Sequence, residues 1–325
     1  AALDAGCIGC STGLVYEPGR YAQTDELVTL AHEMHEAGGV YASHMRNEGA
    51  ALLESVRETI AIGSDAGVPV QISHHKASGR SAWGLVHDSL GLIEQARARG
   101  VDVTADQYPY TASSTALFAV LQNHDDRAHG IGEVEWDRVT LASAPRHPDW
   151  ERRSVADIAT ELHTDPAGAA RAIVDVEGYS AIVVMETMHE PDVCTVMAHP
   201  TTMIGSDGIP TLGGKPHPRL YGTFARVLGH YARDVGVLPL EAAVHRMTGM
   251  PAAKFGLAGR GAVAPGAAAD LVLFDPATIE DVATYDAPRR YPAGVVAVWV
   301  NGTCVMRDGR HTGARPGRAL RRNGS

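Results

Sequence analysis

The feature that most constrains this chain is an alternation of strand-like and helix-like segments over its first 110 residues. Apolar, β-prone runs recur at 7–11, 40–43, 69–73 and 101–106. Between them lie segments with apolar residues three and four positions apart, which end at Gly38, Gly67 and Gly100. Strands that alternate with helices are typical of βαβ units and a parallel sheet. The pattern therefore predicts an α/β fold with a (β/α) barrel architecture.

The three helical segments are predicted at 24–37, 50–66 and 85–99. In the first, Leu27, Leu30, Ala31 and Met34 share one face, and Thr24 is the expected N-cap. Each segment is followed by a glycine, the residue that most often closes a helix in the left-handed conformation. These marked ends favour helices that cross over between parallel strands.

The remaining sequence divides the chain into a catalytic domain and a smaller domain. Residues 1–260 are predicted as part of a barrel, and the loosely patterned, proline-containing segment 121–170 is predicted as an insertion above its rim. From 261 to 325 the sequence changes to short strands. Asn301-Gly302 between two apolar runs predicts a hairpin there, because a type I′ turn needs positive φ at both positions.

Composition restricts the partners of the chain. Its 325 residues carry a formal net charge of −10, which argues against nucleic acid or an anionic membrane as the main partner. No apolar run is long enough to cross a bilayer. The four cysteines are too few and too scattered for a disulfide framework, and buried thiols are the favoured interpretation of Cys7 and Cys10. We therefore expect a cytoplasmic protein that acts on a small molecule.

Three side chains that can bind a metal or accept a proton come directly after strand-like runs: His44, His74 and Asp207. In a parallel barrel the carboxyl ends of the strands open on one face, where active sites are assembled. A single histidine at a strand end is more often a hydrogen-bonded structural residue than a metal ligand. The pair with a rim aspartate instead indicates zinc in a catalytic site, with Asp207 accepting a proton from an activated water.

Two neighbours of His74 receive different predictions. Lys76 lies two residues further along and is expected on the same side, where it can bind a substrate carboxylate or remain a surface lysine. His75 is expected to point the other way and to pack. Together these assignments favour a metallohydrolase.

Several motifs resemble those of the D-aminoacylase (N-acyl-D-amino-acid deacylase) branch of the amidohydrolase superfamily. They occur at residues 11–19, 43–48, 72–76, 106–110, 199–208 and 217–224. The resemblance implies a zinc-dependent (β/α)8 barrel with a small β-sandwich. It also implies that the chain corresponds to the portion from about the fourth barrel strand onward. A His-x-His pair and a metal-sharing cysteine belong upstream of that strand, and the sequence contains no His-x-His.

The resemblance implies a role for each matching residue. His44 and His74 become metal ligands and Asp207 becomes the general base. Lys76, Tyr108 and Ser114 match positions that hold the substrate carboxylate or polarise the scissile amide. Two further members of the pocket are implied, Arg46 and Tyr16.

The sequence thus predicts hydrolysis of the linear amide of N-acyl-D-amino acids. Two alternatives remain at this stage. One is a cyclic amidohydrolase, of the hydantoinase or dihydroorotase kind. The other is a non-catalytic, truncated remnant, which the missing upstream strands make plausible because five barrel strands leave unpaired edges.

Overall fold

The centre of the molecule is a five-stranded parallel sheet. A computed structural model describes residues 2–124, 130–211 and 213–321. The strands follow one another in the order β1-β2-β3-β4-β8, and all four pairings between them are parallel. Their bounds are β1 (Gly9–Gly13), β2 (Val40–His44), β3 (Val70–Ile72), β4 (Val103–Gln107) and β8 (Thr202–Ile204). This sheet is the incomplete barrel that the sequence predicts.

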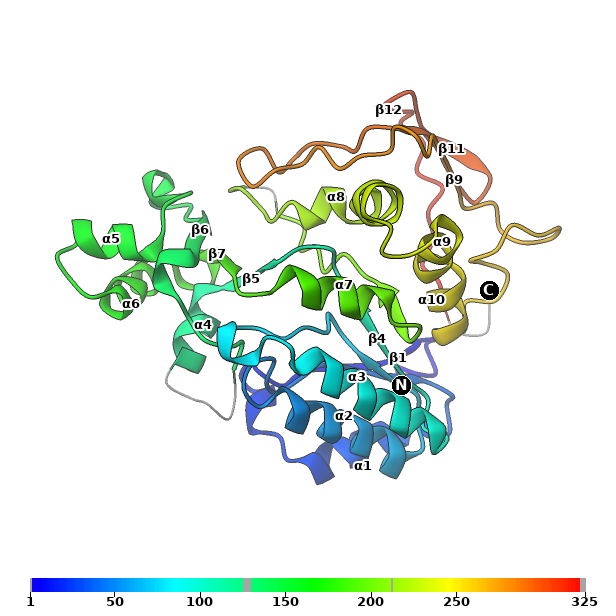
Figure 1. The fold of residues 1–325 in the computed structure, drawn as a ribbon. Helices are drawn as coiled ribbons and strands as arrows, with labels where there is room; N and C mark the ends of the chain where they lie inside the picture. The colour runs from blue at the N-terminus through cyan, green and yellow to red at the C-terminus, as the bar shows by residue number, and fades with distance from the viewer. Residues whose placement is uncertain (1, 125–129, 212, 322–325) are drawn as a thin grey trace.

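Helices cover the outer face of this sheet (Figure 1). They are α1 (Thr24–His35), α2 (Leu52–Ala66), α3 (Leu85–Ala98) and α7 (Glu190–Ala198). Leu27, Ala31 and Met34 of α1 are buried as predicted, in one core cluster with strand residues such as Ile72. Leu30, also expected on the buried face, is exposed because it lies at the margin of that face. The expected N-cap is displaced by one residue, because the cap position is Gln23 and Thr24 begins the helix. Gly67 adopts the predicted left-handed conformation, with φ of 68°.

A separate lobe rises from the carboxyl end of the sheet (Figure 1). It contains a three-stranded antiparallel sheet in the order β5-β7-β6, of which β6 lies within the predicted insertion and the other two strands lie on either side of it in the sequence. The strands are β5 (Ala112–Ala116), β6 (Val139–Ser143) and β7 (Ile182–Glu186). They pack with α4 (Leu117–His124), α5 (Val155–Glu161) and α6 (Pro166–Glu177) in a second apolar core. We refer to residues 112–186 as the cap.

The chain after β8 is helical. Helix α8 (Arg219–Arg226) continues directly into a π-helical segment, η6 (Val227–Val235), and is followed by α9 (Leu240–Met247) and α10 (Gly249–Lys254). Single 3₁₀ turns occur elsewhere: η1 (Gly19–Tyr21), η2 (Arg80–Ala82), η3 (Trp136–Arg138), η4 (Pro148–Trp150) and η5 (Gly178–Ser180). Among the described residues, no helix combines the length and apolar character needed to cross a membrane.

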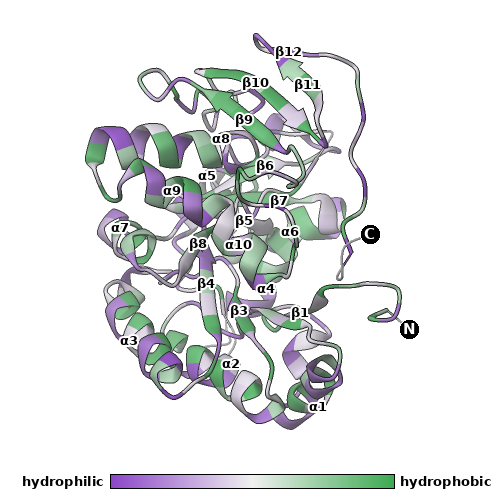
Figure 2. Cartoon of the chain, turned by 90° about the vertical axis from the view of Figure 1, so that its right-hand side faces the viewer, coloured by the Kyte–Doolittle hydropathy of each residue, from purple (hydrophilic) through white to green (hydrophobic). Residues whose placement is uncertain are grey.

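The last element is a four-stranded antiparallel sheet in the order β12-β11-β10-β9. Its strands are β9 (Leu271–Phe274), β10 (Val295–Val300), β11 (Thr303–Arg307) and β12 (Arg310–His311). The predicted Asn301-Gly302 turn joins β10 to β11, with φ of 47° and 80°. Strands β9 and β10 are strongly hydrophobic (Figure 2), and Val272 and Leu273 are exposed. The fold class is therefore confirmed.

The prediction of buried thiols near the N-terminus is wrong. Cys7 and Cys10 are exposed, because β1 pairs only with β2 among the described strands and forms the edge of the sheet. All four cysteines are unpaired. The apolar run that suggested burial instead marks an edge strand, since burial of a strand requires neighbours on both sides.

Candidate metal centre

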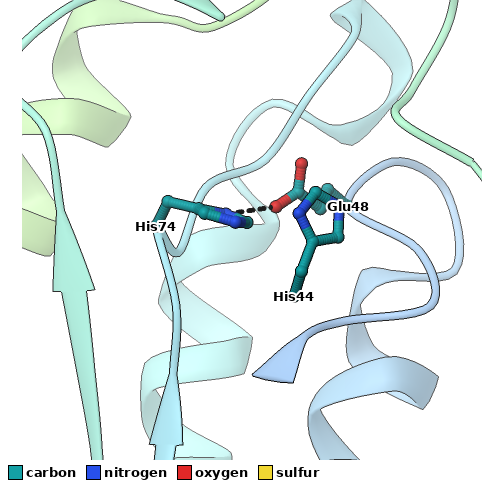
Figure 3. Close-up of side chains that lie close together, drawn as sticks. All are labelled: His44, Glu48 and His74. Atoms are coloured by element: carbon teal, nitrogen blue, oxygen red, sulfur yellow. Dashed lines mark ion pairs between the residues drawn. The ribbon is translucent and has the colours of Figure 1, made fainter. Parts of the chain in front are cut away.

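The two predicted ligands lie together at the carboxyl end of the sheet. His44 is the last residue of β2 and His74 follows β3, and the ladder between these strands pairs Ser43 with Ile72. The two ring centroids are 4.4 Å apart (Figure 3). Burial lowers the pKa of the His44 imidazole to about 3, so it is neutral at physiological pH. A neutral imidazole is the form that binds a metal.

Glu48, which the sequence analysis did not select, completes this cluster. One ligand atom from each of His44, Glu48 and His74 lies within 4.8 Å of the others. Glu48 Oε1 is 2.9 Å from His74 Nδ1 (Figure 3). Burial by itself raises the pKa of the Glu48 carboxyl, but the Lys76 ammonium and the two imidazoles outweigh it and hold that pKa well below its usual range. The sequence feature that could have indicated Glu48 is its position four residues after His44, in the loop that follows the same strand.

Lys76 is buried beside the same carboxylate. Its Nζ is 2.6 Å from Glu48 Oε1 and 2.9 Å from His74 Nδ1, and its side chain is 5% exposed. The alternative of a surface lysine is thereby removed. His75 packs as expected, with Nε2 2.9 Å from the hydroxyl of Ser89 on α3.

Asp106, at the end of β4, fixes the backbone of His74. Its Oδ1 accepts a hydrogen bond of 2.8 Å from the His74 amide, and its Oδ2 accepts one of 2.6 Å from Gln71 Nε2. His74 has φ of 38°, a conformation that non-glycine residues rarely adopt. Burial raises the pKa of the Asp106 carboxyl. This carboxylate therefore supports the turn that presents the His74 ring.

Asp207 lies beyond β8, outside the cluster of His44, Glu48 and His74. Its Oδ2 is 2.9 Å from Nη2 of Arg219, the first residue of α8. The Arg219 side chain is only 3% exposed, and its Nη1 is buried without a hydrogen-bond partner among the described residues. Asp207 also has positive φ, 47°. Arg219 lies in the motif at residues 217–224, but the sequence did not predict a role for it.

The ring of Tyr108 links the two charged groups. Arg219 Cζ lies 4.4 Å and Lys76 Nζ 5.5 Å from its centroid, distances at which a cation is attracted to an aromatic ring. The Tyr108 hydroxyl is buried and has no hydrogen-bond partner among the described residues. Burial raises its pKa well above the usual value. An unpaired buried donor of this kind is available to a ligand oxygen.

Two implied pocket members have different surroundings. The Tyr16 ring is 4.9 Å from the His44 ring, and its hydroxyl is 3.1 Å from Thr115 of the cap. Burial raises the pKa of Tyr16 to about 12. Arg46, by contrast, is bound by Glu58 of α2 at 2.9 Å and donates to two backbone carbonyls. Its guanidinium is therefore engaged within the fold.

A small cavity of about 40 Å³ lies between the cap and the start of α8. Ser114 and Arg219 both line it, together with Gly208, the residue after Asp207. Apolar side chains such as Ile182 and Leu220 form much of the remaining wall. A partly apolar cavity with a few convergent polar groups is the usual form of a small-molecule site. The cavity brings Ser114 to the same side of the molecule as Arg219.

The donor set fits a divalent metal such as zinc. His44 Nε2 is buried without a hydrogen-bond partner, and His74 Nε2 also has none in the described part of the chain. Two imidazoles shielded from bulk water are ligands that zinc accepts in catalytic sites, and a carboxylate beside them, such as Glu48, either binds the metal or orients a ligand histidine. The residues present are thus compatible with the metal that the sequence predicts.

Comparison with known proteins identifies the relatives of this arrangement. The family described as "Amidohydrolase family" matches residues 12–306. A D-aminoacylase of Alcaligenes xylosoxydans xylosoxydans is 44% identical over 99% of this chain, and an N-acyl-D-glutamate deacylase of the same organism is 43% identical over 100%. The solved N-acyl-D-glutamate deacylase of Bordetella bronchiseptica, complexed with zinc and a phosphonate inhibitor, has a TM-score of 0.89 at 40% identity, covering 98% of this chain.

The chain matches only part of the length of these relatives, and it is also similar to more distant proteins. The chain spans 63% of each of the two curated relatives and 64% of the solved deacylase. The L-hydantoinase of Arthrobacter aurescens is similar at a TM-score of 0.56 and 18% identity, over 95% of this chain and 66% of its own. A likeness at that level shows a common fold and nothing more.

Proposed function

The chain belongs to the amidohydrolase family, and from that premise we propose that it takes part in zinc-dependent hydrolysis of N-acyl-D-amino acids. The observation that carries this proposal is the convergence of His44, Glu48 and His74 at the end of the parallel sheet. It is supported by relatives of 43–44% identity that are named as deacylases of this kind. The chain spans less than two thirds of their length, so the activity of the whole protein is part of the proposal.

In this proposal His44 and His74 hold the zinc. When bound, the metal supplies Lewis acidity and lowers the pKa of a water molecule from about 15.7 to near 7. The neutral His44 imidazole is ready to bind, since burial has already removed its proton. Asp106 keeps the His74 backbone in place through its hydrogen bond to the His74 amide.

Asp207 serves as the general base and then as the general acid. It accepts a proton from the attacking water and transfers it to the leaving nitrogen of the amide. Its ion pair with Arg219 holds the carboxylate in a defined position at the edge of the site. Its positive φ is consistent with a residue held in a defined orientation by its surroundings.

The substrate carboxylate is bound by the cationic side of the site. Arg219 is the strongest candidate, because one of its buried nitrogens lacks a partner and it lines the cavity beside Ser114. Lys76, which lies 5.5 Å from the centre of the Tyr108 ring, and the unpartnered Tyr108 hydroxyl complete the predicted set. Tyr16 contributes to the wall beside His44. We assign Arg46 no direct contact with substrate, because Glu58 and two carbonyls already bind it.

The cyclic amidohydrolases share only the fold at the identity found, and nothing favours them over the linear amide. We retain a reducing, cytoplasmic setting as a prediction from the four unpaired cysteines. Residues 1–260 and 261–325 remain our proposed domain division.

A substrate panel tests the proposal. The zinc-loaded protein is assayed with N-acetyl-D-amino acids, their L-enantiomers and hydantoins, and release of acetate or ring opening is measured. We expect turnover of D-enantiomers at least tenfold above the other two classes. Turnover confined to hydantoins would assign the cyclic activity, and a protein that neither binds zinc nor turns over any substrate would support the non-catalytic alternative.

A further inference from the structure

We propose that Glu48 is a positioning residue, whose carboxylate accepts a hydrogen bond from Nδ1–H of His74 and forms an ion pair with Lys76. One buried carboxylate thereby fixes the orientation of a metal ligand and the position of a substrate-binding cation. The inference rests on the proposed function above and adds to it the residue that prepares His74. No role for Glu48 follows from the sequence motifs or the comparisons.

The contacts of Glu48 carry the inference. Its Oε1 lies 2.9 Å from His74 Nδ1 and 2.6 Å from Lys76 Nζ. The three side chains are 5–10% exposed, so water does not screen these charges. An ionised carboxylate is buried in a protein only where partners compensate it. Lys76 and Glu48 therefore compensate each other's charge, and removal of either leaves the other buried and unpaired.

The backbone of Glu48 is held from two sides. Its amide donates to the carbonyl of Gly130 in the cap, at 2.9 Å, and its carbonyl accepts from the amide of Ser78 after β3, at 2.8 Å. The carboxylate is thus fixed relative to both the cap and the loop that carries Lys76.

The geometry favours one tautomer of His74. Lys76 Nζ is also 2.9 Å from His74 Nδ1, so the ring nitrogen either donates to Glu48 or accepts from Lys76. An ammonium can rotate its protons away from Nδ1, whereas a carboxylate oxygen repels a lone pair from every direction. The charge-assisted bond from Nδ1–H to Glu48 is therefore preferred. It leaves the lone pair on Nε2, the nitrogen without a protein partner, free for the metal.

The first test is the tautomer of His74 in the unsubstituted, metal-free protein. ¹⁵N–¹H correlation spectra of the imidazoles distinguish a protonated Nδ1 from a protonated Nε2, and the His74→Ala spectrum identifies the signal. We expect His74 to carry its proton on Nδ1. A proton on Nε2 would show that Lys76 donates to the ring and would overturn the proposal without any substitution of Glu48.

The second test compares zinc affinities by competition with a chromogenic chelator. Glu48→Ala is expected to weaken zinc binding by about 10- to 100-fold, the usual effect of removing a group that orients a ligand histidine. Glu48→Gln keeps an oxygen that can accept from Nδ1–H, so its loss is expected to be on the order of threefold. Glu48→Gln removes the charge beside Lys76, however, and we expect the KM for the substrate to change more than its zinc affinity.

Glu177 provides a matched control in the cap. Its carboxylate is fully buried and its Oε1 lies 3.2 Å from Nδ1 of another histidine, His147, far along the chain from the metal centre. Glu177→Ala should leave zinc affinity at the parent value. Equal affinities in Glu48→Ala and the parent would refute the positioning role. Absence of zinc binding in the parent would instead refute the proposed function, and the tautomer measurement would still decide the present inference.

Discussion

The carboxylate of Asp207 and the guanidinium of Arg219 form an ion pair of 2.9 Å, and the arginine is almost completely buried. The Arg219 guanidinium and the Lys76 ammonium both lie close to the Tyr108 ring, at 4.4 and 5.5 Å from its centroid. Two acid–cation pairs, Glu48 with Lys76 and Asp207 with Arg219, therefore meet at the Tyr108 ring. Each cation has its own acid, and this pairing determines how substitutions will act.

Asp207→Asn should abolish turnover while leaving zinc binding largely intact. The amide of asparagine cannot accept a proton, and loss of a general base costs about 10²- to 10⁴-fold in rate. Zinc content is measured by elemental analysis alongside kcat. Activity within tenfold of the parent would remove Asp207 from the mechanism.

Arg219→Lys should weaken binding of the substrate carboxylate. A lysine cannot both stack on Tyr108 and present two nitrogens, so we expect kcat/KM to fall by about 10- to 100-fold, which corresponds to one hydrogen bond to a charged group. The same variant is assayed with an N-acyl amine that lacks the carboxylate. An equal loss on both compounds would mean that Arg219 acts through Asp207 alone.

Asp106→Ala should weaken zinc binding by about tenfold, because the His74 amide loses its acceptor and the positive φ of His74 is no longer supported. Asp106→Asn is the control, since its side-chain oxygen can still accept from that amide. Chelator competition measures both variants. If Asp106→Ala binds zinc as tightly as the parent does, Asp106 does not position the ligand.

His217 should make stability depend on pH. Burial and the nearby Arg219 charge hold the pKa of its imidazole well below the usual value, and the hydrogen bond to the Ala112 carbonyl opposes them only in part. In the folded protein Nδ1 accepts from the Arg219 amide and Nε2 donates to the Ala112 carbonyl. The unfolded chain binds a proton below about pH 6.5 and the folded one does not, so stability falls as the pH is lowered. Between pH 7.5 and 5.5 this one group contributes a loss of about 1.4 kcal/mol.

Urea unfolding of the parent and of His217→Asn at these two pH values measures the effect. The variant should lose about 1.4 kcal/mol less than the parent over that interval. Identical losses in the two proteins would show that His217 is protonated in the folded state or exposed.

Local sequence was sufficient for the elements and for part of the site. The alternation of apolar runs and glycine-terminated helices predicted the parallel sheet. The spacing of apolar residues along a segment indicates whether it is a helix or a strand and which of its faces is buried. Strand ends also located His44 and His74, because parallel strands bring their carboxyl ends to one rim. The Asn301-Gly302 hairpin followed from the backbone conformation that only a few residue types adopt easily.

Tertiary structure alone decided which charges meet. Glu48 and Lys76 are 28 residues apart, and Asp207 and Arg219 occupy a loop and a helix. Such contacts depend on the register of neighbouring strands and on the paths of the loops, which no local pattern encodes. The exposure of Cys7 and Cys10 has the same origin: a strand's sequence reports its preference for a sheet, whereas its burial depends on which strands lie beside it.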